Sequence, residues 1–404
     1  SPNWVGARAV GVNAEGPYIN PAKKGAQAGE HIVPGDAAFL LEYPEVKQTT
    51  IAPEMHENLA CVKELAENGV VVSIGHTGAT YAQAREAIEA VGGMAAFVSP
   101  NETVFVKANL GTAGFVRHDI FQTGECTKPE IIITVAEECL KAGAAEVIIG
   151  EAGQTDRFDW ATLRALDDSA DLATEAKRLS DQYAGKVTLA CLEVESPEWD
   201  PIDSPWTGLE RIYISSLLAR ADRVITLPVF KTHRWCHVTG GLKNFVGTTS
   251  RAHYGPGSAN RTALHQAAGG VEQCFLDIVA AVKPVLSIMD MSVCCEGDGP
   301  HVLPGWWGTT IDVKDRLGSW LILVGTDLPA VDATAARIVG QDVAAVNYLN
   351  WAYHQGLGQI QQDKIDLVGR TLSELAMDWQ PARQTEGFCE VIIPGIMMMF
   401  ERPT

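Results

Sequence analysis

Short apolar runs alternate with longer helical patterns over most of the chain, and this alternation constrains the fold more than any other feature. Near-continuous apolar strands alternating with helices are typical of a mainly parallel sheet covered on both faces. We therefore predict an α/β fold with a mainly parallel sheet and helices on both faces. The predicted strands are residues 70–74, 103–107, 146–150, 187–192, 223–228, 285–290, 321–325 and 390–393. The predicted helices are residues 129–142, 171–183, 209–221, 262–282, 330–339 and 343–355.

Composition narrows the class of protein. With 404 residues and 46% hydrophobic content, the chain can form two domains, or one large domain with an appendage. The net charge of −19 argues against binding to nucleic acid or to an anionic membrane. No apolar run approaches the roughly 20 residues that span a bilayer. The nine cysteines show no C-x-x-C or iron–sulfur spacing, so we expect reduced thiols and a cytoplasmic protein.

A basic island interrupts this acidic chain. Residues 223–271 contain no Asp or Glu. Such a local inversion of charge concentrates anions, and Gly240, Gly241 and Gly247 would let backbone amides approach a ligand. The island matches neither a Walker loop nor G-x-G-x-x-G, so a nucleotide is not specifically indicated. Its basic residues are Arg223, Lys231, Arg234, Lys243, Arg251, Arg261, His233, His237, His253 and His265.

Other polar residues follow the predicted strands, where parallel sheets bind ligands. The loops after two strands, residues 229–244 and 291–308, would carry the site. We predict a small phosphate or carboxylate ligand there, with or without a divalent metal, and a charged contact worth roughly 1.5–3 kcal/mol for each of Lys231 and Lys243. The predicted ligand-binding residues are Lys107, Asn109, Glu151, Lys231, Lys243, Asn244, Arg251, His253 and Asp290. The predicted catalytic residues are His233, His237 and Glu296, with a histidine moving a proton and Glu296 acting as general base or metal ligand.

Simpler interpretations stay open for several of these residues. The island could be a solvated loop that balances acidic neighbours, and His265 could be structural. Asp327 and Asp332 could act as charges at a helix N-terminus. Cys294 and Cys295 fit buried, inert thiols. Four aromatic residues fit either a core or a partner interface: Phe230, Trp235, Trp306 and Trp307.

The N-terminal segment resembles N-acetylglucosamine-6-phosphate deacetylase, a metalloenzyme of the amidohydrolase superfamily. Residues 5 to about 92 carry the motifs AEGPYINPAKKGA, TIAPE and SIGHTGATYAQA. The family is a (β/α)8 barrel, and the resemblance implies that Glu15 and His76 bind zinc or iron. A few βα units cannot close an eight-stranded barrel, so we expect an N-terminal βα appendage. Two departures stand out: residues 95–101 read AAFVSPN where a third metal-binding His is expected, and Gln27 replaces a substrate-contacting His. No context for the catalytic Asp is recognisable, so we expect a partial, inactive segment.

From about residue 82 the chain resembles the domain-of-unknown-function 362 family. The matching motifs are VFVKANL, TKPEIIITVAEECLKAGAAEVIIGEA, ADRVITLPVFKTH, TGGLKNFVG, EGDGP, GTDLPAVDATAARIVG and GLG. The resemblance implies an α/β fold and leaves the reaction open. Some members carry iron–sulfur modules, for which this chain lacks the cysteines. We therefore expect a deacetylase-like segment at 1–92 and a second domain at 93–404.

Three hypotheses for function follow. The first is binding of a small anion by the second domain, the second is a metal-dependent deacetylase-like hydrolase, and the third is a non-catalytic binding or assembly module. A homo-oligomer is compatible with each of them.

Overall fold

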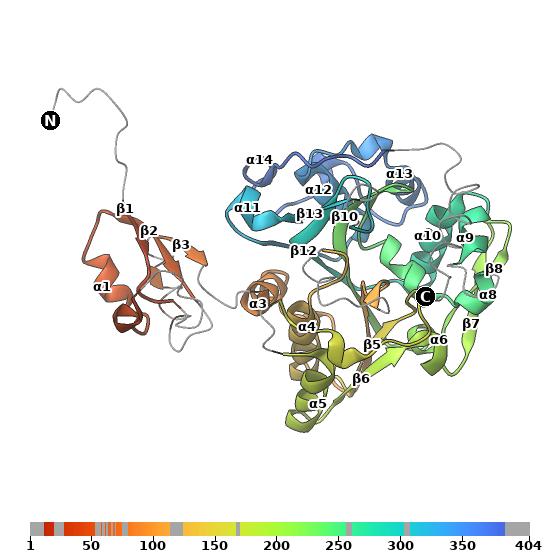
Figure 1. Ribbon diagram of the computed structural model, residues 1–404, viewed down its shortest axis with the longest axis horizontal. Coiled ribbons are helices and arrows are strands. Elements are labelled where there is room, and N and C mark those ends of the chain that lie inside the picture. The colour runs from red at the N-terminus through yellow and green to blue at the C-terminus, as the bar shows by residue number, and fades with distance from the viewer. Residues whose placement is uncertain are drawn as a thin grey trace, which may run out of the picture. The chain divides into compact units, whose positions relative to one another are not determined.

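The computed structural model describes residues 12–19, 28–52, 70–74, 80–113, 124–166, 170–255, 261–302 and 308–383, with Asn58, Cys61, Glu64, Leu65 and Asn68. Two compact units make up the chain, Ser1–Gln83 and Ala84–Thr404 (Figure 1). His76, Gln27, Trp306, Trp307 and the predicted strand at 390–393 lie outside the described residues.

The first unit contains a parallel sheet in the order β1-β2-β3. Its strands are β1 (Val12–Glu15), β2 (Val46–Ile51) and β3 (Val71–Ile74), accompanied by η2 (Gly29–His31) and α1 (Ala37–Leu41). Buried Asn58 ties the unit together, because its Nδ2 donates to the carbonyls of Tyr18 at 3.0 Å and Ala52 at 2.8 Å. Its Oδ1 accepts from the Gly35 N–H at 2.6 Å. The described part of this unit is thus a three-stranded sheet, of which the apolar pattern predicted only β3.

The second unit is built on a nine-stranded sheet with the central order β11-β10-β12-β9-β4-β5-β6. Its strands are β4 (Thr103–Ala108), β5 (Glu146–Glu151), β6 (Lys186–Cys191), β9 (Arg223–Leu227), β10 (Val229–His233), β11 (His237–Thr239), β12 (Leu286–Glu296), β13 (Thr309–Asp312) and β14 (Leu321–Gly325). The pairings of β4, β5, β6, β9, β10 and β12 with one another are parallel, whereas β11, β13 and β14 pair antiparallel. The predicted α/β class with a mainly parallel sheet is confirmed.

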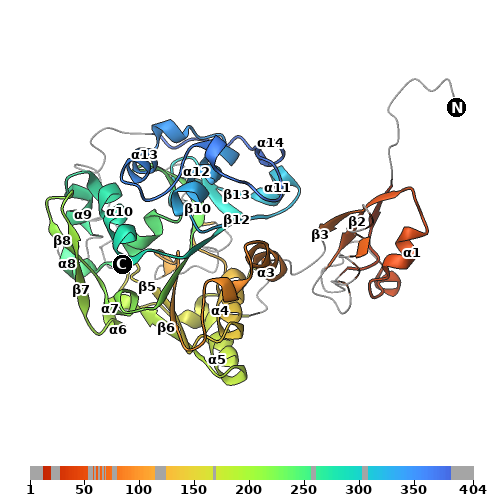
Figure 2. The same cartoon turned by 180° about the vertical axis from the view of Figure 1, so that it is seen from behind.

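Helices flank this sheet. Figures 1 and 2 show α4 and α5 side by side against β5 and β6, and α12 beside α13 and α14 near β12. Aspartates begin two of them, because Asp171 accepts from the Thr174 N–H at 2.8 Å and Asp327 accepts from the Ala330 N–H at 2.9 Å. The helices are α3 (Thr80–Ala90), η3 (Met94–Ala96), α4 (Pro129–Lys141), η5 (Trp160–Thr162), α5 (Leu172–Gln182), α6 (Leu192–Glu195), α7 (Ser216–Ala219), η6 (Lys243–Thr248), α8 (Arg251–Tyr254), α9 (Thr262–Gln266), α10 (Gly270–Val282), α11 (Val313–Leu317), α12 (Leu328–Ile338), η7 (Val343–Ala345), α13 (Asn347–His354), η8 (Gln362–Lys364) and α14 (Leu372–Leu375).

Two helix predictions were wrong in part. Residues 209–221 form β8 (Glu210–Ser215) and then α7, because the alternating sequence ERIYIS buries Ile212 and Ile214 in a hairpin with β7 (Trp199–Ser204). Residues 262–282 form two helices, α9 and α10, with a break at Gly269, whose φ is +73°.

The two predicted loops also contain strands. Residues 229–244 include β10 and β11, and β12 continues past Asp290 as far as Glu296. All eleven residues of β12 are buried, as are all five of β10. Phe230 is completely buried, which excludes it as a partner anchor. Burial raises the pKa of the Cys295 thiol to about 12 and raises that of Cys294 further, so both thiols stay protonated and inert near neutral pH.

Among the described residues, we find no helix with the length and apolarity needed to cross a bilayer.

Candidate functional site

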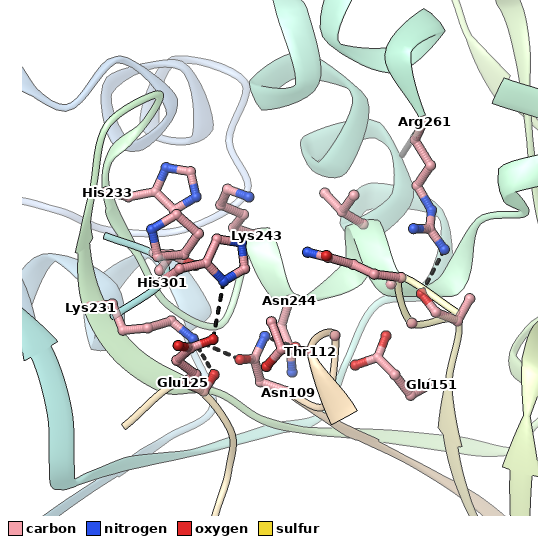
Figure 3. Close-up of a pocket in the computed structure, with 18 of the residues that line it drawn as sticks. Asn109, Thr112, Glu125, Glu151, Lys231, His233, Lys243, Asn244, Arg261 and His301 are labelled. Atoms are coloured by element: carbon pink, nitrogen blue, oxygen red, sulfur yellow. Dashed lines mark hydrogen bonds and ion pairs between the residues drawn. The ribbon is translucent and has the colours of Figure 1, made fainter. Parts of the chain in front are cut away.

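A cavity of about 190 Å³ opens beyond the carboxyl ends of β4 and β5, beside β10 and η6 (Figure 3). Asn109 directly follows β4, Glu151 ends β5, and Lys231 lies on β10. This edge is where parallel sheets bind ligands, because the strand ends leave backbone and side chains facing a crevice. The lining residues are Asn109, Gly111, Thr112, Glu125, Glu151, Ala152, Gly153, Gln154, Lys231, His233, Trp235, Thr239, Lys243, Asn244, Val246, Gly247, Arg261, His265, Pro300 and His301.

A buried ion pair forms the base of the cavity. Lys107 Nζ lies 2.9 Å from Glu151 Oε2, which also accepts from the Leu110 N–H at 2.7 Å. Burial lowers the pKa of Lys107, and the charge of Glu151 opposes that shift. Gly247 covers the pair, since a Cβ there would lie 2.0 Å from Glu151 Oε1. Only glycine fits at position 247 without displacing the pair.

A directed chain of hydrogen bonds crosses the cavity from β10 to β4. Lys231 Nζ donates to Asn109 Oδ1 at 2.7 Å, and Asn109 Nδ2 donates to Asn244 Oδ1 at 3.3 Å. Asn244 Nδ2 then donates to the Lys107 carbonyl at 2.7 Å and to Thr226 Oγ1 at 3.0 Å. Each amide therefore has one fixed orientation.

Lys231 is almost fully buried, at 3% exposure. Its ammonium also donates to the Glu125 carbonyl at 2.7 Å and forms no ion pair with a carboxylate in the described part of the chain. Burial lowers the pKa of Lys231 to about 8, and the nearby carboxylate of Glu125 opposes that shift. At neutral pH this lysine is mostly charged, with a substantial neutral fraction.

Two of the histidines that line the cavity are neutral at pH 7. Burial lowers the pKa of His233 well below its usual range, and the nearby Lys243 and Lys231 charges add to the shift. His233 Nδ1 accepts from the Trp235 N–H at 3.1 Å, which leaves the hydrogen on the other ring nitrogen. Burial lowers the pKa of His265 to about 3, helped by Lys243 and Arg261.

The third histidine, His301, is joined to a carboxylate. Its Nδ1 lies 3.0 Å from Glu125 Oε2, and Glu125 Oε1 accepts from the Val302 N–H at 2.9 Å. Burial alone would raise the pKa of Glu125. The hydrogen bond to His301, the charge of that histidine and the bond from the Val302 N–H act in the opposite direction and lower the pKa. Glu125 is thus ionised and bonds to a histidine that lines the same cavity.

Two further cations face the cavity. Arg261 donates to the Thr249 carbonyl at 2.7 Å, to the Ala152 carbonyl at 2.6 Å and to Glu193 at 3.2 Å. Burial lowers its pKa to about 10, so it stays charged at pH 7. Lys243 is half-buried and has no hydrogen-bond or ion-pair partner among the residues with described positions. Figure 3 shows its side chain among the other labelled residues of the cavity.

The structure brings together six of the predicted site residues: Asn109, Glu151, Lys231, His233, Lys243 and Asn244. Lys107 lies directly beneath them, bonded to Glu151. The sequence pattern missed Glu125, and it missed His301 although the loop that contains it, residues 291–308, was predicted to carry the site. Arg261 and His265 were visible as members of the basic island, but their positions in the chain gave no reason to choose them.

Five predicted residues lie outside the lining. Arg251 bonds to Gln154 O and Asp156, and His253 stacks on Tyr213 with ring centroids 5.0 Å apart. His237 is half-buried at the start of β11. Two carboxylates have partners elsewhere: Asp290 is paired with Lys128, and Glu296 binds Arg316 through both oxygens at 2.5 and 2.9 Å.

For metal binding, the structure offers little support. Within the described residues no group of three or more His, Cys, Asp or Glu is arranged to hold a metal ion. His76 lies outside those residues, and Glu15 is placed only through its backbone in β1. The predicted Glu15–His76 site therefore stays a prediction.

Residues 104–337 match the sequence model of the family described as Domain of unknown function (DUF362). The chain belongs to the DUF362 family. The thylakoid-associated protein sll1697 of Synechocystis sp. is 26% identical over 280 residues, which cover 67% of this chain and 76% of that protein. The cavity residues Asn109 to His301 all lie inside the DUF362 match.

The N-terminal resemblance is confirmed as well. N-acetylglucosamine-6-phosphate deacetylase of Lysinibacillus sphaericus is 37% identical over 94 residues, which cover 22% of this chain and 24% of that enzyme. The chain thus spans about a quarter of the length of this relative. A solved structure from Thermotoga maritima is similar with 12% identity and a TM-score of 0.36, over 62% of this chain and 56% of that one. Likeness at that level supports no conclusion about function.

Proposed function

We propose that the DUF362 unit binds a small anionic ligand, carrying a phosphate or carboxylate group, in the cavity at the end of β4 and β5. The observation that carries this proposal is the ammonium of Lys243, which forms no hydrogen bond or ion pair with the described residues. Lys231, Lys243 and Arg261 face the cavity, whereas both lining carboxylates are engaged, Glu125 with His301 and Glu151 with Lys107. Burial raises the pKa of Glu272 to about 7, although the charge of Lys243 opposes that shift, so a ligand anion would be the stronger partner of this half-buried cation.

The volume of the cavity limits the size of the ligand. Sites for drug-sized molecules enclose roughly 300–1,000 Å³, so a cavity of 190 Å³ suits phosphate or an acid of a few carbon atoms. Asn109, whose Nδ2 has a second hydrogen beyond the one donated to Asn244, the neutral His233 and the glycine-lined wall add directional contacts that a simple point charge lacks.

Lys243→Met is expected to weaken binding of phosphate or of a small carboxylate by about 1.5–3 kcal/mol, roughly ten- to a hundredfold, because it removes one charged contact and keeps the side-chain length. Isothermal titration calorimetry against phosphate, acetate, glyoxylate and oxalate would measure this. Lys177→Met is the matched control, since Lys177 is an exposed lysine on α5. Unchanged affinity in the Lys243 variant, or no binding of any of these ions by the native chain, would overturn the proposal.

For the first unit we expect no deacetylase activity. The segment where the third metal-binding His is expected, residues 95–101, contains no His and belongs to the second unit, Ala84–Thr404. The measurement is acetate release from N-acetylglucosamine 6-phosphate with zinc or iron added. Metal-dependent release above that of a Glu15→Gln variant would contradict the expectation and restore the hydrolase hypothesis.

A further inference from the structure

We infer that Lys231 is a nucleophile whose Nζ adds to the carbonyl carbon of the bound ligand and forms an imine. The ligand would then be a small oxo acid, with its anionic group on Lys243 and its carbonyl group at Lys231. This inference rests on the proposed anion site for the position of the ligand.

Lys231 differs from the other two buried lysines of the same unit. Lys107 is paired with Glu151 at 2.9 Å, and Lys128 with Asp290 at 3.2 Å. An adjacent carboxylate favours the ammonium form of a lysine, which has no lone pair to donate. Among the described residues, Lys231 Nζ bonds instead to two neutral oxygens, Asn109 Oδ1 and Glu125 O, both at 2.7 Å.

The two hydrogen bonds also orient the amine. A neutral amine has two hydrogens, and both are directed to these two oxygens. The remaining tetrahedral position then carries the lone pair, on a side chain that lines the cavity. Burial lowers the pKa of Lys231 to about 8, so about half of it is neutral at pH 8, against less than about 1% of an ordinary lysine.

The proton balance needs a donor and acceptor beside the amine, and His301 with Glu125 supplies it. The Nζ lone pair forms the C–N bond while the carbonyl π pair moves to oxygen, which takes up a proton. The amine then loses its two hydrogens as protons, and the hydroxyl takes up a second proton and leaves as water. The products are one imine and one water molecule. His301 bonds to the side-chain carboxylate of Glu125, and the backbone carbonyl of Glu125 accepts from Lys231 Nζ. The His301–Glu125 pair therefore lies close to the amine (Figure 3).

The test is reductive trapping on the full chain. Glyoxylate with cyanoborohydride at pH 7 should add a carboxymethyl group to Lys231 about tenfold faster than to exposed Lys177, as read by peptide mass mapping. The labelling rate at Lys231 should rise with a midpoint near the pH at which its amine is half neutral. Even labelling of all lysines, or an unlabelled Lys231, would overturn the inference.

Formaldehyde separates this inference from the proposed anion site, because it is a carbonyl compound without charge. Lys243→Met should lower the ratio of glyoxylate trapping to formaldehyde trapping at Lys231 about tenfold or more, because only glyoxylate has an anionic group. If formaldehyde labels Lys231 preferentially and the rate of glyoxylate trapping does not depend on Lys243, the nucleophile is supported and the anion site is wrong. If glyoxylate binds through Lys243 by calorimetry but Lys231 stays unlabelled by either reagent, the anion site stands and the imine fails.

Discussion

Lys128→Met is expected to lower the free energy of unfolding by about 3–5 kcal/mol, because it leaves the carboxylate of Asp290 buried without its counter-ion. Both side chains are completely buried, with Lys128 Nζ 3.2 Å from Asp290 Oδ2. The same ammonium donates to the Val293 carbonyl, so the substitution also leaves that acceptor unpaired on β12. Urea denaturation followed by near-UV circular dichroism would measure the loss.

A second substitution at Asp290 checks this cause. In the double variant Lys128→Met/Asp290→Asn, a neutral amide replaces the unpaired charge and still accepts from the Ser292 N–H, which now bonds to Asp290 Oδ1 at 2.9 Å. We expect it to regain a large part of the lost stability, because a neutral pair has a smaller cost of desolvation. A single variant as stable as the exposed-site control Lys177→Met would show that the pair contributes little.

Asp332→Ala is expected to cost about 2–6 kcal/mol, because two buried backbone N–H groups lose their acceptor at roughly 1–3 kcal/mol each. Asp332 Oδ1 accepts from the Gly241 N–H at 2.7 Å, and Oδ2 accepts from the Leu242 N–H at 3.1 Å. Gly240 leaves room for this carboxylate, since a Cβ there would lie 2.3 Å from Oδ1. The expected loss is read by the same denaturation experiment, with Ala330→Gly on the same helix as a control for helix propensity.

The pH dependence of stability separates the effect of the Asp332 charge from the effect of its packing. Burial raises its pKa to about 7, although the two N–H donors oppose the shift. The folded state therefore holds a proton that the unfolded state releases near its ordinary pKa, so this contribution to stability is full below about pH 4 and is lost as the pH rises to 7. Relative to the native chain, Asp332→Asn should gain stability between pH 4 and pH 7. A constant difference over that range would contradict the shift.

Much of the central sheet could be predicted from hydrophobicity alone. The predicted strands at 103–107, 146–150 and 321–325 agree with β4, β5 and β14 to within one residue. The apolar pattern of these strands, with runs of three or four residues, suffices to predict them, although β14 is only partly buried. It failed at β10, whose sequence VFKTH contains Lys231 and His233 and yet is buried throughout. A buried polar strand cannot be told from a loop without its hydrogen-bond partners.

Part of the candidate site could also be predicted from the sequence. Residues that end strands β4 and β5 could be placed at one edge, because the ends of parallel strands meet there. Glu125 and His301 reach the cavity from segments far apart in sequence and bond to each other at 3.0 Å, which no local pattern indicates. Glu296 was predicted in the site but does not line the cavity, because Arg316, twenty residues later, binds both of its carboxylate oxygens.

The direction of the hydrogen-bond chain from Lys231 to Asn244 has a consequence for the ageing of the protein. Asn109 accepts at one end and donates at the other. Deamidation would keep its shape but remove the donor, so that two oxygens would face each other at Asn244 while Lys231 gained a carboxylate counter-ion. Replacement of one amide by a carboxylate would then favour the ammonium form of Lys231, and the protein would lose the inferred nucleophile without a change of fold.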